Sequence, residues 1–202
     1  MANYKTTRIV PVTIILIIVA IAIAALVSFS RAIFFSGSTN TTTQTDSSRQ
    51  ALLNTSADHA VKMIVRGEIV ADETFRSYQI QITPNGRTLT LYKGYLDQVV
   101  NNISLGNNIP AYEQFVYALD KANLMKGTAL TGDSNDLRGI CATGLVYEFT
   151  VLKADKAVKQ LWTTSCSSLH GSLNANVSLS QLTKLFTAQI PGSKSLIDEL
   201  WQ

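Results

Sequence analysis

Apolar and polar residues alternate along three successive segments in the first half of the chain. Residues 61–70, 75–83 and 87–95 each place apolar side chains at alternate positions. Alternation with a period of two predicts β-strands that bury one face. In the first segment the side chains predicted to be buried are Val61, Met63, Val65 and Ile69. Residues 98–105 also favour a strand, with a short helix as the alternative.

Two tight turns are predicted between strands. Pro84 presets the φ angle of a turn, and the Asn85-Gly86 pair after it tolerates the positive φ that hairpin loops require. A second hairpin is predicted because segments 145–152 and 157–164, both rich in packing residues, flank a short polar turn.

Helical spacing replaces the alternation in two places. Residues 107–110 (Asn-Asn-Ile-Pro) predict the start of a helix that ends near residues 123–127, and Ser178 to Gln181 predict the capped start of another. Their expected buried faces are Tyr112, Phe115, Val116 and Leu119 in the first helix, and Leu179, Leu182, Leu185 and Phe186 in the second. Pro191-Gly192 ends the second helix, and a short amphipathic tail follows. Together these elements predict an α+β domain over residues 61–202, an antiparallel sheet of about 5–6 strands with two packed helices.

A continuous apolar segment precedes this domain. From Ile9 to Phe29 the chain carries no charge, and as a helix this segment spans roughly 31 Å, which matches a hydrocarbon core of about 30 Å. We therefore expect a short tail at residues 1–8, a transmembrane signal anchor at 9–29, and a Ser/Thr-rich tether and lead-in at 30–60. The other interpretation is a cleaved signal peptide, although the apolar region of such peptides is usually only about 7–15 residues long.

The charged residues indicate the orientation of this segment and exclude one class of partner. Lys5 and Arg8 precede it and Arg31 follows it, whereas all 14 acidic residues come after Gly37, so these three basic residues account for the net charge of +3. More positive charge on the N-terminal side favours a cytoplasmic N-terminus. We expect a single-pass protein of the cell membrane, in contact with the lipid bilayer, whose domain lies outside the cytoplasm. That domain has no cluster of Lys and Arg, so a nucleic-acid partner is not expected.

The two cysteines are expected to form a disulfide. Cys141 and Cys166 lie just outside the second predicted hairpin, which brings them close together, and an oxidising compartment favours their pairing. Closing the loop between them is expected to stabilise the fold by about 3.5 kcal/mol in the chain-entropy estimate.

The alternative is that Cys166 is a nucleophile. Residues 161–166 (Leu-Trp-Thr-Thr-Ser-Cys) resemble the strand-end TLxTC motif of sortases, which are membrane-anchored enzymes outside the cytoplasm. The resemblance implies a thiolate at Cys166 that acts together with a histidine and an arginine. Here His170 follows Cys166 and the last arginine, Arg138, precedes it. This order departs from the family's pattern and leaves no arginine after the cysteine to stabilise an oxyanion.

No motif predicts a cofactor, a metal site or a set of catalytic residues. His59 and His170 form no recognisable ligand cluster, and the segment around Asp133 and Asp136 lacks the alternating oxygen ligands of a calcium loop. Three aromatic residues have two open interpretations, an exposed binding patch or packing against the sheet: Tyr92, Tyr95 and Trp162.

The polar segment 128–139 is the longest irregular stretch predicted in the domain, and loops often carry recognition residues. Its candidate binding residues are Asp133, Asn135, Asp136 and Arg138. The sequence thus favours a non-enzymatic binding or structural module of the cell envelope, whose partner is another envelope or surface protein. The alternatives are a thiol-dependent, sortase-like envelope enzyme that uses Cys166, and an accessory subunit of a membrane complex.

Overall fold

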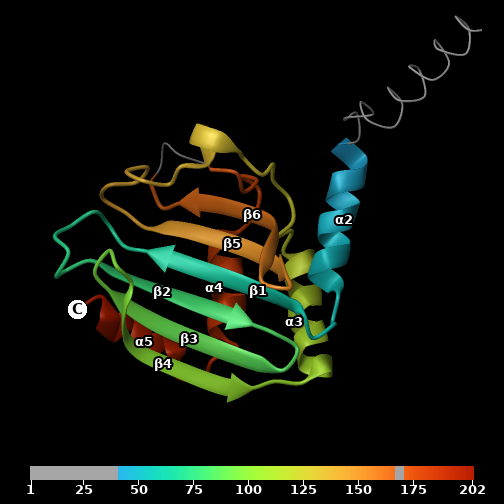
Figure 1. Cartoon of the computed structure of the whole chain (residues 1–202), viewed down its shortest axis with the longest axis horizontal. Helices are drawn as coiled ribbons and strands as arrows, with labels where there is room; N and C mark the ends of the chain where they lie inside the picture. Colours follow the sequence, from blue (N-terminus) through green and yellow to red (C-terminus); the bar gives the residue numbers. More distant parts are fainter. Residues whose placement is uncertain (1–40, 167–170) are drawn as a thin grey trace, which may run out of the picture. The chain divides into compact units, whose positions relative to one another are not determined.

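A six-stranded antiparallel sheet in the order β4-β3-β2-β1-β5-β6 is the centre of the domain (Figure 1). The computed structural model describes residues 41–166 and 171–202, with side chains from residue 47 onward. The strands are β1 (His59–Arg66), β2 (Arg76–Ile82), β3 (Gly86–Lys93), β4 (Gln98–Gly106), β5 (Val146–Lys153) and β6 (Lys156–Thr164). The helices are α2 (Thr41–Leu53), α3 (Ile109–Lys121), α4 (Leu179–Thr187) and α5 (Ser193–Leu200), with a short 3-10 helix η1 (Gly132–Asn135). The predicted α+β class, the antiparallel sheet and the strand at residues 98–105 are confirmed.

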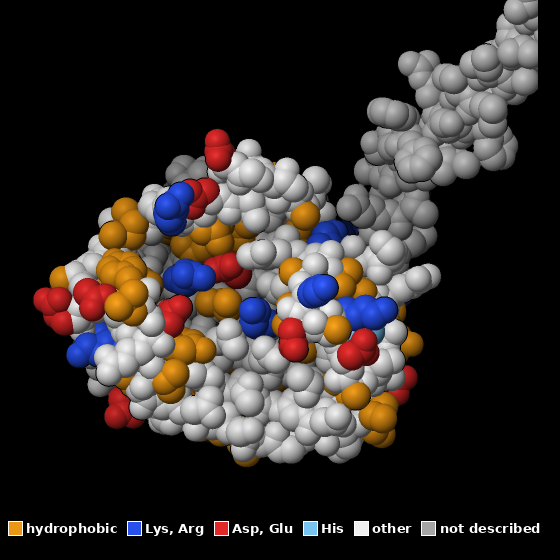
Figure 2. Space-filling model, viewed as in Figure 1, with side chains coloured by type: hydrophobic (Ala, Val, Ile, Leu, Met, Phe, Trp, Pro, Cys, Tyr) orange, Lys and Arg blue, Asp and Glu red, His pale blue; other side chains and the backbone are white. Residues whose placement is uncertain are grey.

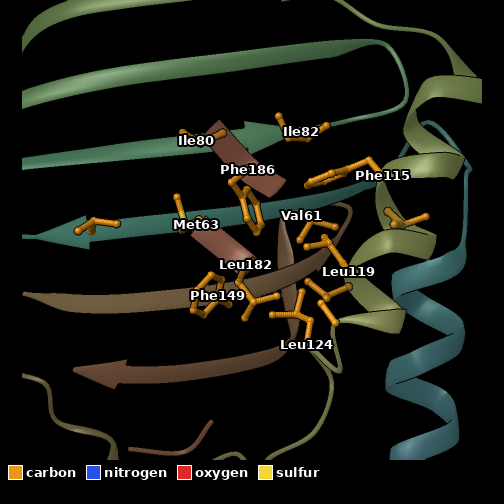
Figure 3. Close-up of a cluster of buried hydrophobic side chains, with 14 of the residues drawn as sticks. Val61, Met63, Ile80, Ile82, Phe115, Leu119, Leu124, Phe149, Leu182 and Phe186 are labelled. Carbon is orange, nitrogen blue, oxygen red and sulfur yellow. The ribbon is translucent and has the colours of Figure 1, made fainter. Parts of the chain in front are cut away.

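The helices make the two faces of the sheet different. Helices α4 and α5 lie behind the sheet in Figure 1, and the face toward the viewer carries none of the described helices. We call these the covered face and the open face. On the covered face Met63 of β1 is paired with Ile80 of β2 on one side and with Phe149 of β5 on the other. These side chains point toward Leu182 and Phe186 of α4 (Figure 3).

Helix α3 contributes to the same core with the residues that its spacing predicts. Tyr112, Phe115, Val116 and Leu119 are buried, and the ring centroid of Phe115 lies 5.2 Å from that of Phe186. Asn108 caps the helix, because its side-chain oxygen accepts a hydrogen bond from the N–H of Ala111. The predicted helix start and its buried face are therefore confirmed.

Strand β1 ends at Arg66, so the prediction that it continues to residue 70 is wrong. A Cβ atom at Gly67 would lie 2.8 Å from Cζ3 of Trp201 and 2.9 Å from the carbonyl oxygen of Arg76, so only glycine fits there. The chain then leaves the sheet. Ile69, for which the alternation predicts burial, is 51% exposed in the loop that follows.

The turn between β2 and β3 lies where the sequence predicts it, but its expected mechanism is wrong. Neither Asn85 nor Gly86 has a positive φ angle. Thr83 holds the turn instead: its N–H donates to the carbonyl of Gly86 (2.8 Å), and its Oγ1 accepts from the N–H of Gly86 (2.8 Å). A threonine hydroxyl can thus stabilise a turn that needs no left-handed residue. In the second hairpin, by contrast, Ala154 and Asp155 both have positive φ (47° and 61°).

Helix α2 occupies part of the segment for which the sequence predicts a tether and then a short amphipathic or irregular lead-in. Its Leu52 is fully buried in the core cluster, and Nε and Nη2 of Arg49 each donate to the carboxylate of Asp120 in α3 at 2.8 Å. A buried leucine and an ion pair with α3 therefore attach this helix to the domain, although it has few apolar residues. The predicted tail, the predicted membrane segment and the first part of the tether lie outside the described residues. Among the helices that the structure describes, none has the length and apolar character needed to cross a bilayer.

Candidate functional site

Three loops meet at one end of the sheet, although they are far apart in the sequence. They are residues 67–75 between β1 and β2, residues 94–97 between β3 and β4, and residues 136–145 before β5. The hydroxyl of Tyr95 donates to the carbonyl of Val70 (2.7 Å) and accepts from its N–H (3.1 Å). The first and third loops are also joined, because the N–H of Ile69 donates to the carbonyl of Ala142 at 2.8 Å.

A cavity of about 360 Å³ lies among these loops. Its size falls at the lower end of the range of about 300–1,000 Å³ that is typical of small-molecule sites. Apolar side chains make up most of its wall, together with two arginines. The lining residues are Arg66, Gly67, Ile69, Phe75, Tyr95, Leu137, Arg138, Gly139, Ile140, Cys141 and Val146. Figure 2 shows the open side of the molecule, where apolar patches lie beside Lys, Arg, Asp and Glu side chains around a hollowed surface.

Aromatic stacking stiffens one side of this cavity. The rings of Phe75 and Tyr95 are stacked with centroids 4.1 Å apart, and the carboxylate of Asp72 accepts a hydrogen bond from the N–H of Tyr95 at 2.7 Å. Exposed apolar residues gather at the same end: Ile69 is 51% exposed and Leu96, next to Tyr95, is 94% exposed. Exposed apolar groups beside a preformed cavity are typical of a binding surface.

The predicted disulfide is present, and it fixes another part of the cavity wall. Cys141 lines the cavity, and its Sγ is bonded to Sγ of Cys166, just beyond the end of β6. The side chain of Ser165 adds a second link, because its Oγ accepts a hydrogen bond from the N–H of Leu145 at 2.8 Å. The third loop is therefore attached to the sheet at both Cys141 and Leu145.

A buried carboxylate lies on the open face next to the cavity. Glu148 of β5 is only 5% exposed. Its Oε1 accepts a hydrogen bond from Nε of Arg66 (2.7 Å), and its Oε2 accepts one from Nε2 of Gln160 (2.9 Å). Charge-assisted hydrogen bonds of this kind are stronger than neutral ones and fix the geometry of both partners. Arg66, whose side chain is 45% exposed, extends from this network to the cavity wall.

The four candidate binding residues of segment 128–139 make different contacts in the structure. Asn135 is structural, since its Oδ1 accepts a hydrogen bond from Nε1 of Trp162 (3.1 Å) and so attaches the loop to β6. Asp136 and Arg138 pair with each other, and Arg138 is the one of the four that lines the cavity. The hydrogen bonds from Arg138 lower the pKa of Asp136 to about 2. Asp133 is exposed in η1.

Trp162 and Tyr95, for which the sequence allows either packing or an exposed binding patch, differ in exposure. Trp162 is buried (3% exposed), whereas Tyr95 is 47% exposed and lines the cavity. The interpretation that the side chain packs against the sheet is therefore confirmed for Trp162. Tyr95 instead belongs to an exposed apolar surface.

The geometry does not support a nucleophilic thiol in the oxidised protein. Both sulfurs are used in the disulfide, and His170 lies outside the described residues. His59 is at the opposite end of β1 from Arg66, about 23 Å away at the usual rise of a strand. Its Nδ1 lies 2.8 Å from Oδ1 of Asp58. Within residues 41–166 and 171–202, no group of three or more His, Cys, Asp or Glu side chains is arranged to hold a metal ion.

Comparison of the chain with models of known protein families gives no match, and comparison with curated protein sequences gives none either.

Sequence reasoning missed the residues that shape this site. Arg66, Glu148 and Gln160 come from three different strands, and only the register of the sheet shows that they are neighbours. A local signal does exist for Glu148, which is the single charged residue in the mostly apolar segment from Val146 to Leu152. A charge that is buried in such a strand needs hydrogen-bond or ion-pair partners, so its presence indicates a specific pairing.

Proposed function

We propose that this protein is a membrane-anchored binding module of the cell envelope, and that the cavity at the loop end of its sheet binds an apolar ligand or an apolar segment of an envelope partner. The apolar segment from Ile9 to Phe29 supports the anchor. The observation that carries the binding function is the cavity itself, an apolar space whose walls are braced by a disulfide, a stacked aromatic pair and hydrogen bonds between loops. Such bracing keeps a site open before the ligand arrives, which lowers the entropic cost of binding.

Binding is tested with N-phenyl-1-naphthylamine, a neutral probe that fluoresces in apolar surroundings. The full chain in detergent is titrated with the probe and compared with two variants. Ile69→Asp places a charge in the cavity wall and is expected to weaken binding at least tenfold. Ile109→Asp is the matched control, because Ile109 is 53% exposed, close to the 51% of Ile69, but lies at the start of α3. Equal binding by all three proteins, or no binding by any, contradicts the proposed function.

The location of the module is tested separately. Protease added to intact cells is expected to digest the C-terminal domain and to leave a membrane-embedded N-terminal fragment. Thiol titration of the denatured, unreduced protein is expected to find no free thiol. A protected domain with two free thiols contradicts an extracytoplasmic position.

A further inference from the structure

We infer that the ligand of this cavity is an amphiphile with a single negative charge, and that the guanidinium of Arg66 binds its anionic group. This inference rests on the proposed binding function and gives the ligand a chemical class. The starting observation concerns the ends of the Arg66 side chain. Its Nε donates to Glu148, whereas within the described part of the chain Nη1 and Nη2 donate no hydrogen bond. These two nitrogens can together bind a carboxylate end-on in bidentate fashion.

The network behind Arg66 holds this side chain in place. Glu148 is buried and uses one oxygen for Arg66 and the other for Gln160, so it is itself fixed from two sides. A guanidinium that is attached through Nε holds its terminal nitrogens in a fixed direction, because the group is planar and rigid. A preordered donor loses less conformational entropy when an anion binds than a free arginine does.

The charges around the cavity favour an anion over a cation. Among the described residues that line it, both charged ones are arginines. Arg138 is more fully occupied than Arg66, since both its Nε and its Nη2 donate to the carboxylate of Asp136, whereas Arg66 uses Nε alone for Glu148. Arg66 is therefore the available cation, and it stands at the wall of an apolar space where electrostatic attraction is screened less than in bulk water.

The remaining lining determines the other half of the ligand. Ile69, Phe75, Leu137 and Val146 offer only carbon to a bound molecule. A small inorganic anion would leave this surface unfilled, and a neutral apolar molecule would leave Arg66 without its partner. An aliphatic or aromatic body with one carboxylate satisfies both. Such a group is present at the end of a fatty acid and at the C-terminus of an apolar peptide.

A pair of matched probes tests this inference. 1-Anilinonaphthalene-8-sulfonate has the skeleton of N-phenyl-1-naphthylamine with one added sulfonate, so the ratio of their Kd values isolates the contribution of the anion. We expect the sulfonate to bind at least tenfold more tightly to the full chain at low salt, the factor that a charge-assisted hydrogen bond contributes. The advantage is expected to shrink as salt is added.

Variants assign the effect to Arg66. Arg66→Met is expected to weaken binding of the sulfonate at least tenfold and to remove most of the difference between the Kd values of the two probes. Arg49→Met is the matched control, because it removes the same charge from α2, where Arg49 pairs with Asp120. It is expected to change neither Kd. Retained binding of the neutral probe also shows that Arg66→Met is folded. If that variant does not fold, the inference is tested on the unaltered protein, with the pair of probes and the competitors described below.

Competitors distinguish the source of the anion. Octanoate is expected to displace the sulfonate probe, and octylamine, with the same chain and a positive charge, is not. N-acetyl-Leu-Leu with a free carboxylate, compared with its carboxamide, tests the peptide source in the same way. Equal Kd values for the two probes, or displacement by octylamine as readily as by octanoate, overturn the inference while leaving an apolar binding site. Failure of both probes to bind overturns the proposed function instead.

Discussion

The two faces of the sheet differ in what they bury and in how they are held. On the covered face, β1 contributes Val61, Met63 and Val65, which are fully or almost fully buried against apolar residues of neighbouring strands and of α4. On the open face the same strand contributes Lys62, Ile64 and Arg66, and the neighbouring strands place Glu148 and Gln160 beside them. The covered face needs only apolar side chains of suitable size. The open face is held by specific hydrogen bonds between polar side chains. The candidate site lies next to this face.

The largest effect is expected on the covered face. Phe149 is 1% exposed and its ring centroid lies 5.9 Å from that of Phe186, so Phe149→Ala leaves a cavity in the core. The free energy of unfolding should fall by about 4 kcal/mol. Chemical denaturation followed by fluorescence measures this change. On the open face, Gln81→Ala in the neighbouring strand β2 should change it by no more than about 0.5 kcal/mol, and similar losses for both would remove the distinction between the faces.

The disulfide that holds the loop beside the open face should have the next largest effect. Replacing both Cys141 and Cys166 with serine should lower the free energy of unfolding by about 3.5 kcal/mol, because the unfolded chain regains the freedom of the loop. It should also weaken probe binding, since Cys141 lines the cavity. Unchanged binding in the folded double variant would show that the loop keeps its position without the covalent bond.

Breaking the polar network of the open face is expected to cost less. Glu148→Leu removes the acceptor of Arg66 and Gln160 but keeps a side chain of similar size. Because the Arg66 side chain is 45% exposed, water can replace its lost partner, and the loss of stability should be about 1–2 kcal/mol rather than the larger cost of a fully buried charge. Thermal and chemical denaturation measure it. Glu113→Leu on the exposed side of α3 is the control. An equal loss of stability in this variant would show that the hydrogen bonds of Glu148 do not stabilise the fold.

The smallest effect is a gain of stability on the covered face. The hydroxyl of Tyr112 is buried without a hydrogen-bond partner among the described residues, and burial raises the pKa of this group. Tyr112→Phe should therefore stabilise the fold by about 1 kcal/mol. A raised pKa stabilises the folded state below the ordinary pKa of tyrosine, about 10, and this contribution is lost as the pH rises further. Denaturation between pH 8 and 11 should show a smaller alkaline loss in the variant than in the unaltered protein; an equal loss would assign it to Tyr78 and Tyr147, whose pKa values burial also raises.

Sequence reasoning succeeded where the evidence is local and periodic. The helical spacing from Tyr112 to Leu119 and the alternation around Met63 report burial directly, because a single face of each element meets the core. The second hairpin also places Cys141 near Cys166 by counting residues from its turn. In these cases the relevant neighbours lie within a few residues, or across one turn.

Sequence reasoning missed contacts that join distant parts of the chain. Arg66 and Glu148 are 82 residues apart in the sequence, and Tyr95 meets Val70 across 25 residues. The prediction that recognition lies in segment 128–139 rests on the polar and irregular character of that segment, and it stays a prediction. The cavity uses only its last residues, Leu137 to Gly139, and takes its other walls from loops that look unremarkable in sequence. Helix α2 escaped prediction for a similar reason, since Leu52 anchors it only through contacts with the core.

The bond between Cys141 and Cys166 separates the making of this protein into two chemical stages. Strand pairing and core packing need only the chain and water, so the sheet is able to form while both sulfurs are still thiols. The last wall of the cavity receives its covalent attachment only after an oxidant has removed two electrons and two protons from that pair. A newly made chain would thus fold first with two free thiols, and residues 136–145 would gain their covalent attachment to the end of β6 only when the chain meets an oxidant.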